Sequence, residues 1–378
     1  MSRRFGGMTV VALPTVANGE AREIAEQTCR LRGLLVGAAV GDALGLPAEG
    51  LSRWRAQRLY QGQWRHRLVF GRGMISDDTE HTIFVAQSLL CYPNSPERFA
   101  RRLGWCLRGW LLSLPAGVGF ATLRAILKLW LGFPPTRSGV WSAGNGPAMR
   151  VALIGAFFAA DPRRRAAYVA ASTRITHADP KALTGATAIA ELAAWIVRDR
   201  LTQPPSLDAF IALVRACGPD DHDWLSLADT IHRAARDDCT VAELAERLGL
   251  EKGVTGYIYH TVPVAAYAWF RHGGDYRRAL TAALDCGGDT DTVGAIVGAL
   301  AGATVGEPGI PGAWRAGVAD WPRSLPLLRV LAERLTAGAA SGQPAAPVRY
   351  CWPAIPARNL AFLLIVLAHG FRRLLPPY

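Results

Sequence analysis

The sequence predicts an all-α protein, and three observations support this fold class. Apolar residues recur three and four positions apart, which is the spacing of one face of a helix. Alanine, leucine and arginine dominate from Glu20 to about Gly306, and alternating β-branched runs are few. Of the 378 residues, 50% are hydrophobic and 19% are charged, which excludes a disordered chain and predicts a large core in one domain or two.

Individual helices follow from this spacing. One helix is expected where apolar residues fall three and four apart, at Ile189, Leu192, Ala193, Ile196 and Val197. A second helix is expected at Leu207, Phe210, Ile211 and Val214. Proline and glycine cluster between such segments, as at 132–135 and 218–219, and indicate turns.

Four segments are expected along the chain. Residues 1–20 form a loose N-terminal arm, and residues 21–335 form the helical domain. Residues 336–348, rich in Ala, Gly, Ser, Gln and Pro, form a linker. Residues 349–378 form a C-terminal helical tail, whose apolar run 360–368 is too short to span a bilayer and favours a helix that packs on the body.

Composition also predicts the location of the protein. No stretch reaches about 18 uninterrupted apolar residues, so no transmembrane span is expected, and the N-terminus lacks the features of a secretory signal. The seven cysteines are scattered without a close pair, which fits reduced thiols and argues against a disulfide framework or a zinc site. A cytoplasmic location is therefore predicted.

The net charge of +12 raises the question of a nucleic-acid partner. Only three of the 42 basic residues are lysines (Lys128, Lys181 and Lys252), and the arginines are spread along the whole chain. Such a skew is typical of codon bias in a genome, so nucleic acid is not expected as a partner. Positive charge also suits a ligand that carries phosphate.

Two predicted helices carry a glycine at every fourth position, Gly33, Gly37, Gly41 and Gly45 in one and Gly294, Gly298, Gly302 and Gly306 in the other. An interior glycine costs a helix about 1 kcal/mol relative to alanine. Residues four apart share a face, and a face without side chains lets another helix approach closely. Close packing alone would explain the rows, but acidic residues lie beside both: Asp42 and Glu49 at the first, Asp289 and Asp291 at the second.

Two oxygen-rich clusters lie far apart in the sequence. Ser76-Asp77-Asp78-Thr79 precedes a helical run, and Gly287-Gly288-Asp289-Thr290-Asp291-Thr292 opens the second glycine-bearing helix. Helix capping would explain one such cluster, because Ser, Asp and Thr satisfy free N–H groups at a helix start. A cap uses one side chain, however, and the additional carboxylates repel one another unless a cation lies between them.

The chemistry of these clusters indicates a metal. Carboxylate and hydroxyl oxygens without His or Cys nearby suit Mg²⁺ or Mn²⁺ and argue against zinc. Four carboxylates are enough to bridge two divalent ions, which lie about 3.5–4 Å apart in such sites. The clusters therefore predict a binuclear site at two helix N-termini.

Two further motifs are weaker. The segment Ser142–Arg150 places small residues before a helical run, which suits phosphate because backbone N–H groups can approach its oxygens. Taken alone it matches no known phosphate fingerprint, and a plain loop-to-helix turn is the better interpretation. Thr176-His177-Ala178-Asp179 carries a lone histidine, a residue that is more often structural than functional in such a position.

Taken together and in order, the motifs resemble those of the ADP-ribosylglycohydrolase family, which includes the dinitrogen-reductase-activating glycohydrolases and vertebrate ADP-ribosylhydrolases. The resemblance runs from about Leu31 to Gly306 and is carried by Gly37–Gly45 with Glu49, Ser76–Thr79, Ser142–Arg150, Thr176-His177, Gly256-Tyr257 with Val262-Pro263, and Gly287–Gly306. It implies an orthogonal multi-helix bundle around two Mg²⁺ (or Mn²⁺) ions. The implied metal ligands are Ser76, Asp77, Asp78, Asp289, Asp291 and Thr292.

The resemblance also implies an activity. The enzyme would hydrolyse the ribosyl bond of an ADP-ribosylated protein, with arginine adducts favoured, or of a small ADP-ribosyl compound, and release ADP-ribose. The implied ADP-ribose-binding residues are Ser142, Gly144, Asn145, Gly146 and His177. The proton of the attacking water would pass to Glu49 or to one of the ligand aspartates, Asp78 or Asp291, and the choice between them stays open.

The sequence departs from the family pattern at two positions. Ser76 stands where many relatives carry threonine, and it keeps the hydroxyl. Ala143 stands where some relatives place an aromatic residue, so stacking on the ligand must come from elsewhere, with Trp141 and Tyr257 as candidates. The alternative function is a non-catalytic ADP-ribose-binding or toxin-immunity protein of the same fold, and the oligomeric state stays open.

Overall fold

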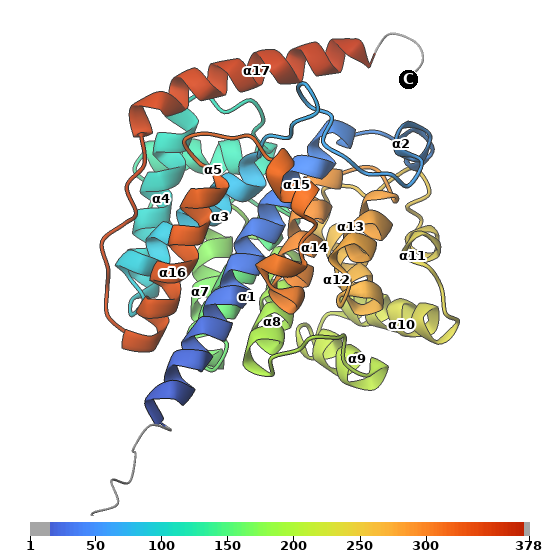
Figure 1. The fold of residues 1–378 in the computed structure, drawn as a ribbon, viewed down its shortest axis with the longest axis horizontal. Coiled ribbons are helices and arrows are strands. Elements are labelled where there is room, and N and C mark those ends of the chain that lie inside the picture. The colour runs from blue at the N-terminus through green and yellow to red at the C-terminus, as the bar shows by residue number, and fades with distance from the viewer. Residues whose placement is uncertain (1–15, 374–378) are drawn as a thin grey trace, which may run out of the picture.

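The computed structural model describes residues 16–373, and the regular secondary structure within them is helical (Figure 1). The first part of the chain forms α1 (Val16–Gly45), α2 (Arg53–Tyr60), α3 (Asp77–Cys91), α4 (Pro96–Leu112), α5 (Phe120–Trp130), α6 (Ala148–Phe157), α7 (Pro162–Arg174) and α8 (Pro180–Arg198). The second part forms α9 (Leu207–Ala216), α10 (His222–Arg236), α11 (Val241–Arg247), α12 (Ile258–His272), α13 (Tyr276–Leu284), α14 (Thr290–Val305), α15 (Gly312–Gly317), α16 (Leu325–Ser341) and α17 (Ile355–Arg372). Short 3-10 helices are η1 (Leu46–Ala48), η2 (Glu307–Gly309) and η3 (Trp352–Ala354). The predicted all-α class is confirmed, and α8 and α9 cover the helices expected from the apolar spacing.

Helices α1 and α14 lie side by side at the centre of the molecule (Figure 1). Their glycines face one another in an antiparallel arrangement, in the pairs Gly33–Gly302, Gly37–Gly298 and Gly41–Gly294. In each pair, a Cβ added to either glycine would overlap the carbonyl oxygen of the other. The glycine rows therefore allow backbone-to-backbone packing, and this packing brings the end of α1 next to the start of α14.

The other helices surround this central pair. Helices α3 and α16 pack on α1, α8, α12 and α13 pack on α14, and α6 packs on both. The buried hydrophobic side chains form one main core, whose members come from positions between Leu31 and Leu335. A second, smaller apolar cluster forms beside α17, from Leu46, Leu68, Met74 and Phe362.

The segment boundaries differ from those expected. Helix α1 begins at Val16, so residues 16–20 of the expected arm are helical, and residues 1–15 lie outside the described residues. Helix α16 continues to Ser341, so the expected linker 336–348 begins with helix and becomes non-helical only after residue 341. Alanine-rich composition explains the difference, because alanine extends a helix as readily as it fills a linker.

Among residues 16–373, two helical stretches are long and apolar enough to cross a membrane by length and composition alone. An apolar 18-residue part of Ala21–Ala48 is 94% buried, so its apolar character is that of a core helix. The corresponding part of Trp352–Arg372 is only 17% buried, and this stretch lies across one end of the bundle (Figure 1). The body binds it through Arg358, Asn359 and Phe362, so Ile355–Arg372 packs on the body as a helix.

Candidate active site

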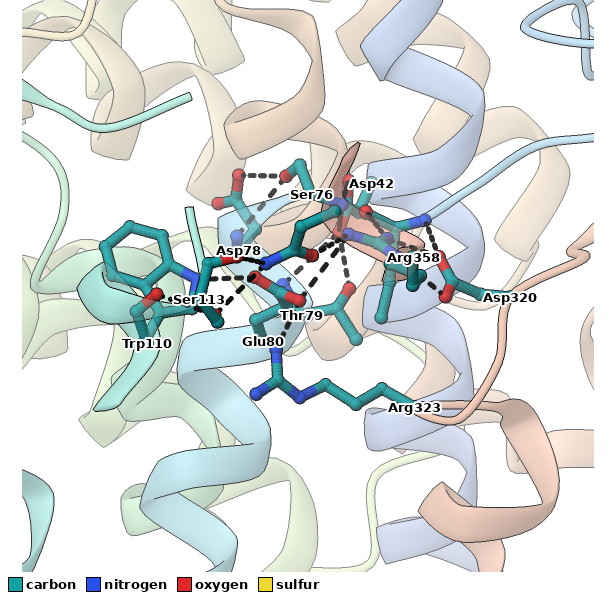
Figure 2. A network of polar contacts seen from close by, with 12 residues as sticks. Asp42, Ser76, Asp78, Thr79, Glu80, Trp110, Ser113, Asp320, Arg323 and Arg358 are labelled. Carbon is teal, nitrogen blue, oxygen red and sulfur yellow. Dashed lines mark hydrogen bonds and ion pairs between the residues drawn. The ribbon is translucent and has the colours of Figure 1, made fainter. Parts of the chain in front are cut away.

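Helix α3 begins at the first acidic cluster, and its start is held by α1. Ser76 is the N-cap, and its hydroxyl accepts a hydrogen bond from the N–H of Asp78 at 3.3 Å. The buried carboxylate of Asp42 on α1 accepts hydrogen bonds from the N–H groups of Ser76 (2.9 Å) and Thr79 (3.2 Å) and from the Thr79 hydroxyl (Figure 2). Burial raises the pKa of Asp42 to about 7, and these hydrogen bonds oppose that rise. Asp42 thus fixes the first turn of α3 against the central helix.

Helix α14 begins at the second cluster, after a sharp turn. Gly287 and Gly288 have φ angles of 68° and 82°, and a Cβ at Gly288 would overlap the backbone of Val254, so this turn requires glycine. Asp289 occupies the N-cap position but makes no capping hydrogen bond with its side chain. Its carboxylate instead accepts a hydrogen bond from Asn145 Nδ2 at 2.7 Å. Capping therefore does not explain this aspartate.

The two clusters come together between these helix starts. Asp78 Oδ2 accepts hydrogen bonds from Ser76 Oγ (3.1 Å) and from Thr292 Oγ1 on α14 (3.3 Å). Asp78 Oδ1 and Asp291 Oδ1 are buried and have no hydrogen-bond partner among the described residues. A buried oxygen without a partner costs free energy, so such oxygens are expected where a bound ligand completes a site.

Burial and mutual repulsion raise the pKa of the carboxyls in these clusters. Burial is the largest cause at Asp77, whose pKa rises to about 8, and repulsion from Asp42 and Glu49 adds to the rise. Burial also raises the pKa of Asp78 and Asp291 well above the usual value, and neighbouring carboxylates again contribute. Like charges gathered in one cavity favour a bound cation.

Glu49 lies on the exposed rim of the same cavity, in the turn after η1. Partial burial of its carboxyl and repulsion from Asp289 raise its pKa, whereas Arg373 on the C-terminal tail lowers it. Arg373 also donates hydrogen bonds to the carbonyls of Glu49 (2.6 Å) and Pro47. The position of Glu49 therefore depends on a contact with the tail.

These raised pKa values predict how the metal-free protein responds to pH. A carboxyl with a pKa near 4 in the unfolded chain and about 8 when folded stabilises the fold at low pH and loses that contribution as the pH rises through this range. We expect the melting temperature in excess EDTA to fall between pH 5 and pH 8, and the Asp77→Asn variant to show a smaller fall. Exposed Asp208 supplies the control: Asp208→Asn should leave the pH dependence unchanged. An identical pH dependence in wild type and Asp77→Asn would contradict the prediction.

The residues of the clusters fit a hard divalent cation. Their donors are carboxylate and hydroxyl oxygens, which Mg²⁺ and Mn²⁺ prefer. In their present rotamers the side chains bind one another, and within residues 16–373 no three Asp, Glu, His or Cys side chains form a ready metal cluster. The unpartnered oxygens of Asp78 and Asp291 are the observation that favours a metal, and side-chain rotation would have to gather the ligands.

A single cavity of about 560 Å³ contains the site. Every sequence-predicted site residue except Asp78 lines it: Glu49, Ser76, Asp77, Ser142, Gly144, Asn145, Gly146, His177, Asp289, Asp291 and Thr292. Asp78 is buried and bonded to Ser76 and Thr292, as described above. Trp141, which is 76% exposed, and Tyr257 do not line this cavity. Tyr257 forms a backbone bridge to Gly144, which does line it, and stacking by either aromatic residue stays a prediction.

The loop that contains Asn145 packs against His177. A Cβ at Gly144 would lie 2.9 Å from His177 Nε2, so a larger residue would displace the imidazole. Burial, assisted by nearby Arg150, lowers the pKa of His177 to about 3, and the ring is therefore neutral at physiological pH. Arg150 is buried and donates hydrogen bonds to the carbonyl of Gly146 (3.0 Å) and to Thr176 Oγ1 (2.7 Å). It thereby joins the loop to the His177 segment.

Sequence reasoning missed part of this cavity. The segment 115–122, which runs from the loop before α5 into its first turn, lines it, and Gly117 and Gly119 just before this apolar helix were a readable signal. The tail helix α17 lines it with Arg358, Phe362 and Val366. No sequence signal identified these three, because arginine and apolar residues on a tail carry no recognisable motif.

Comparison with known proteins identifies the family of this chain. The family model for ADP-ribosylglycohydrolases matches residues 24–345. The chain belongs to the ADP-ribosylglycohydrolase family. The resemblance recognised in the motifs is therefore confirmed, and the protein is a glycosidase-type hydrolase.

Several members of the family match over most of their length. An uncharacterized protein of Archaeoglobus fulgidus is 35% identical over 77% of this chain and 92% of its own. The ADP-ribosyl-[dinitrogen reductase] glycohydrolase of Rhodospirillum rubrum is 26% identical over 75% of this chain and 88% of its own. The ADP-ribosylhydrolase ARH3 of Xenopus tropicalis is 26% identical over 76% of this chain and 90% of its own. A solved structure, an ADP-ribosylglycohydrolase-related protein complex, is 27% identical with a TM-score of 0.59, over 83% of this chain and 99% of its own.

The ADP-ribosylglycohydrolase match includes both acidic clusters and ends at residue 345. Helix α17 begins at Ile355, so the tail that lines the cavity lies outside the segment that defines the family.

Proposed function

We propose that this protein hydrolyses the bond between C1″ of ADP-ribose and the side chain of an ADP-ribosylated protein, with arginine as the favoured acceptor. The carrying observation is the convergence of two acidic clusters at one cavity that the Asn145 loop also lines. Asp291, which lines this cavity, and Asp78, which is buried beside it, each have a buried oxygen without a partner among the described residues. The names of the relatives from Rhodospirillum and Xenopus support ADP-ribosyl chemistry.

Two divalent ions, Mg²⁺ or Mn²⁺, fit this function. Ser76, Asp77 and Asp78 would hold them from α3, and Asp289, Asp291 and Thr292 from α14. When bound, such ions polarise a water and the ribose hydroxyls and lower the pKa of the water towards neutrality. The same clusters supply the negative charge that the ions neutralise, which supports two ions over one.

The glycine-rich side of the cavity suits the diphosphate. Gly117 and Gly119 lie in the loop before α5, and Gly144 and Gly146 lie in the loop before α6. Backbone N–H groups of these loops and the two positive helix ends can therefore approach the phosphate oxygens. Neutral His177 can donate or accept a hydrogen bond there without adding charge. We assign ADP-ribose to this side of the cavity.

A carboxylate beside the ribose would accept the proton of the attacking water. Glu49 lies at the rim with a raised pKa, which moves it towards the operating pH of a general base. We assign the proton of the attacking water to Glu49, with Asp78 and Asp291 engaged in holding the cations. Arginine is the favoured acceptor because the motifs resemble those of the dinitrogen-reductase-activating glycohydrolases, and bacterial relatives of this kind favour arginine adducts.

The test is a comparison of linkages. Arginine-, serine- and nucleobase-linked ADP-ribose are incubated side by side with Mg²⁺, with Mn²⁺ and with excess EDTA, and free ADP-ribose is measured. We expect the arginine adduct to be cleaved fastest, and EDTA to abolish release. Tight calorimetric binding of ADP-ribose without release from any linkage would contradict hydrolysis and identify a binding or immunity protein. Faster release of ADP-ribose from serine or from a nucleobase would overturn arginine as the acceptor and leave the proposed hydrolysis intact.

The seven cysteines are all free, which supports the further proposal of a reducing, cytoplasmic location. Fractionation of cells that produce a tagged full-length chain tests that location.

A further inference from the structure

Helix α17 contacts the residue that precedes the first acidic cluster, although it lies outside the family match. Arg358 Nη2 donates a hydrogen bond to the carbonyl of Ile75 at 2.7 Å. Asp320, in the loop before α16, accepts a hydrogen bond from the N–H of Ile75 at 3.1 Å. Arg358 and Asp320 also form an ion pair, with Nε and Oδ1 3.1 Å apart (Figure 2). One charged pair therefore holds both polar backbone groups of Ile75.

The position of Ile75 matters because of the residues that follow it. Ser76 is the N-cap of α3, and its own N–H is bound by Asp42. The backbone that leads into Asp77 and Asp78 is thus fixed at two successive residues, by α1 at one and by the tail at the other. Fixed backbone restricts where the attached side chains can place their oxygens.

The charged pair is buried, so water does not weaken it. The Arg358 and Asp320 side chains are 8% and 0% exposed. Arg358 also lies 3.6 Å from Glu80, whose carboxylate accepts a hydrogen bond from Trp110 and pairs with Arg323 (Figure 2). Removing one member of such a buried network leaves a charge without compensation, so the local backbone would rearrange.

We propose that Arg358, together with Asp320, is a positioning residue for the candidate metal site. Cation affinity then depends on the C-terminal helix α17. The pair acts through Ile75 on the Ser76–Asp78 turn and has no contact with the cation itself. This inference rests on the divalent-cation part of the proposed function and is independent of the acceptor.

The test measures cation affinity in the full-length protein. Free Mn²⁺ is followed by its electron paramagnetic resonance signal during titration of wild type, Arg358→Met, Arg358→Lys and Asp320→Asn. We expect Arg358→Met and Asp320→Asn to weaken Mn²⁺ binding by about tenfold or more, which is typical of partners that orient metal ligands. Arg358→Lys keeps the charge and should recover part of the affinity. Exposed Arg349 provides the matched control, and Arg349→Met should bind Mn²⁺ like wild type.

The outcomes separate a positioning role from a structural one. Unchanged Mn²⁺ affinity in Arg358→Met, with or without a lower melting temperature, would overturn the inference. Weakened Mn²⁺ binding in a protein that releases no ADP-ribose from any linkage would support the positioning role and overturn only the proposed reaction. Wild-type protein that binds no Mn²⁺ would overturn both the inference and the metal site.

The outer face of α17 supports a second inference on different evidence. Trp352, Leu360, Leu364, Leu367 and Phe371 are each 48–67% exposed along this segment. No acidic residue follows Glu333 in the sequence, and the whole chain carries a net charge of +12. The polar side chains of the helix that bind the body, Arg358 and Asn359, keep it in place, so it can lie along a surface but not cross it.

We infer that this apolar face binds an anionic lipid surface, with α17 in the plane of the membrane. Exposed leucine and aromatic side chains enter the headgroup boundary, and positive net charge attracts the chain to anionic lipid. A second copy of this chain suits the face less well, because two copies carry the same large positive charge.

Vesicle flotation tests this inference. Wild type should float with phosphatidylglycerol-containing vesicles more than with phosphatidylcholine vesicles. The double substitution Leu364→Ser with Leu367→Ser should weaken that binding by about tenfold or more. Val330→Ser, at an exposed valine on α16, is the matched control and should float like wild type. Equal flotation of the double variant and wild type would overturn membrane binding by this face. A wild-type dimer that the double substitution dissociates would also overturn it, because the face would then bind a second copy of the chain.

Discussion

Alanine in place of Asp77 or Asp289 should lower the rate of ADP-ribose release by more than about a hundredfold, because each is proposed to supply an oxygen ligand to a shared cation site. Asp77 lines the cavity from the start of α3, and Asp289 lines it from the start of α14. Loss of either residue would remove one of the proposed ligands that its helix contributes. Release at saturating Mg²⁺ and the affinity for Mn²⁺ are the two measurements.

Stability distinguishes this loss from unfolding. Asp77 is buried among like charges, so Asp77→Ala should melt no lower than wild type in excess EDTA. Asp208→Ala, at an exposed position on α9, is the control and should release ADP-ribose like wild type. Near-normal turnover in Asp77→Ala or Asp289→Ala would contradict the assignment of the site. Loss of turnover together with a large loss of stability would show that the aspartate is structural.

Alanine at Gly41 should destabilise the protein by about 3 kcal/mol or more, which is at the severe end for a single methyl group. Its Cβ would overlap the carbonyl of Gly294, and backbone cannot move aside as a flexible side chain would. The substitution would force α1 away from α14 over several turns. The free energy of unfolding in urea is the measurement.

A matched glycine shows whether the contact or the helix explains the effect. Gly109 lies inside α4, and a Cβ there would meet nothing within 4 Å. Gly109→Ala should therefore stabilise the protein by about 0.5–1 kcal/mol, since alanine is the better helix former. If Gly41→Ala were as stable as wild type, the backbone contact between α1 and α14 would not have the assigned role.

Local patterns predicted much of this fold and site. The four-residue glycine spacing predicted a close helix contact, because each glycine destabilises its own helix and close packing against a neighbouring backbone can compensate for that cost. Repeated carboxylates at Asp77, Asp78, Asp289 and Asp291 exceeded what helix capping uses. The structure places Asp77, Asp289 and Asp291 on one cavity and buries Asp78 next to it, in a hydrogen bond with Thr292. Their role as metal ligands stays a prediction.

Other features depended on tertiary contacts that no local pattern encodes. Asp42 lies beside the glycine row in the sequence. Its hydrogen bonds to the start of α3 could not be predicted, because they follow from how α1 crosses that helix. Arg358 acts on Ile75 across 283 positions of sequence, and an arginine in a tail gives no sign of its partner. Composition placed the linker too early, because alanine is compatible with both linker and helix.

The direct contact between α1 and α14 also bears on how far such sequences can diverge. Sliding one helix along the other would have to proceed in steps of four residues, about 6 Å, since intermediate offsets place Cβ atoms against carbonyls. A single step would carry Asp42 away from the turn it holds. Main chain, and not side-chain shape, therefore sets the spacing between the two acidic clusters. Exchanges in the surrounding hydrophobic residues leave that spacing intact, which is consistent with relatives that share only 26–35% of their residues with this chain.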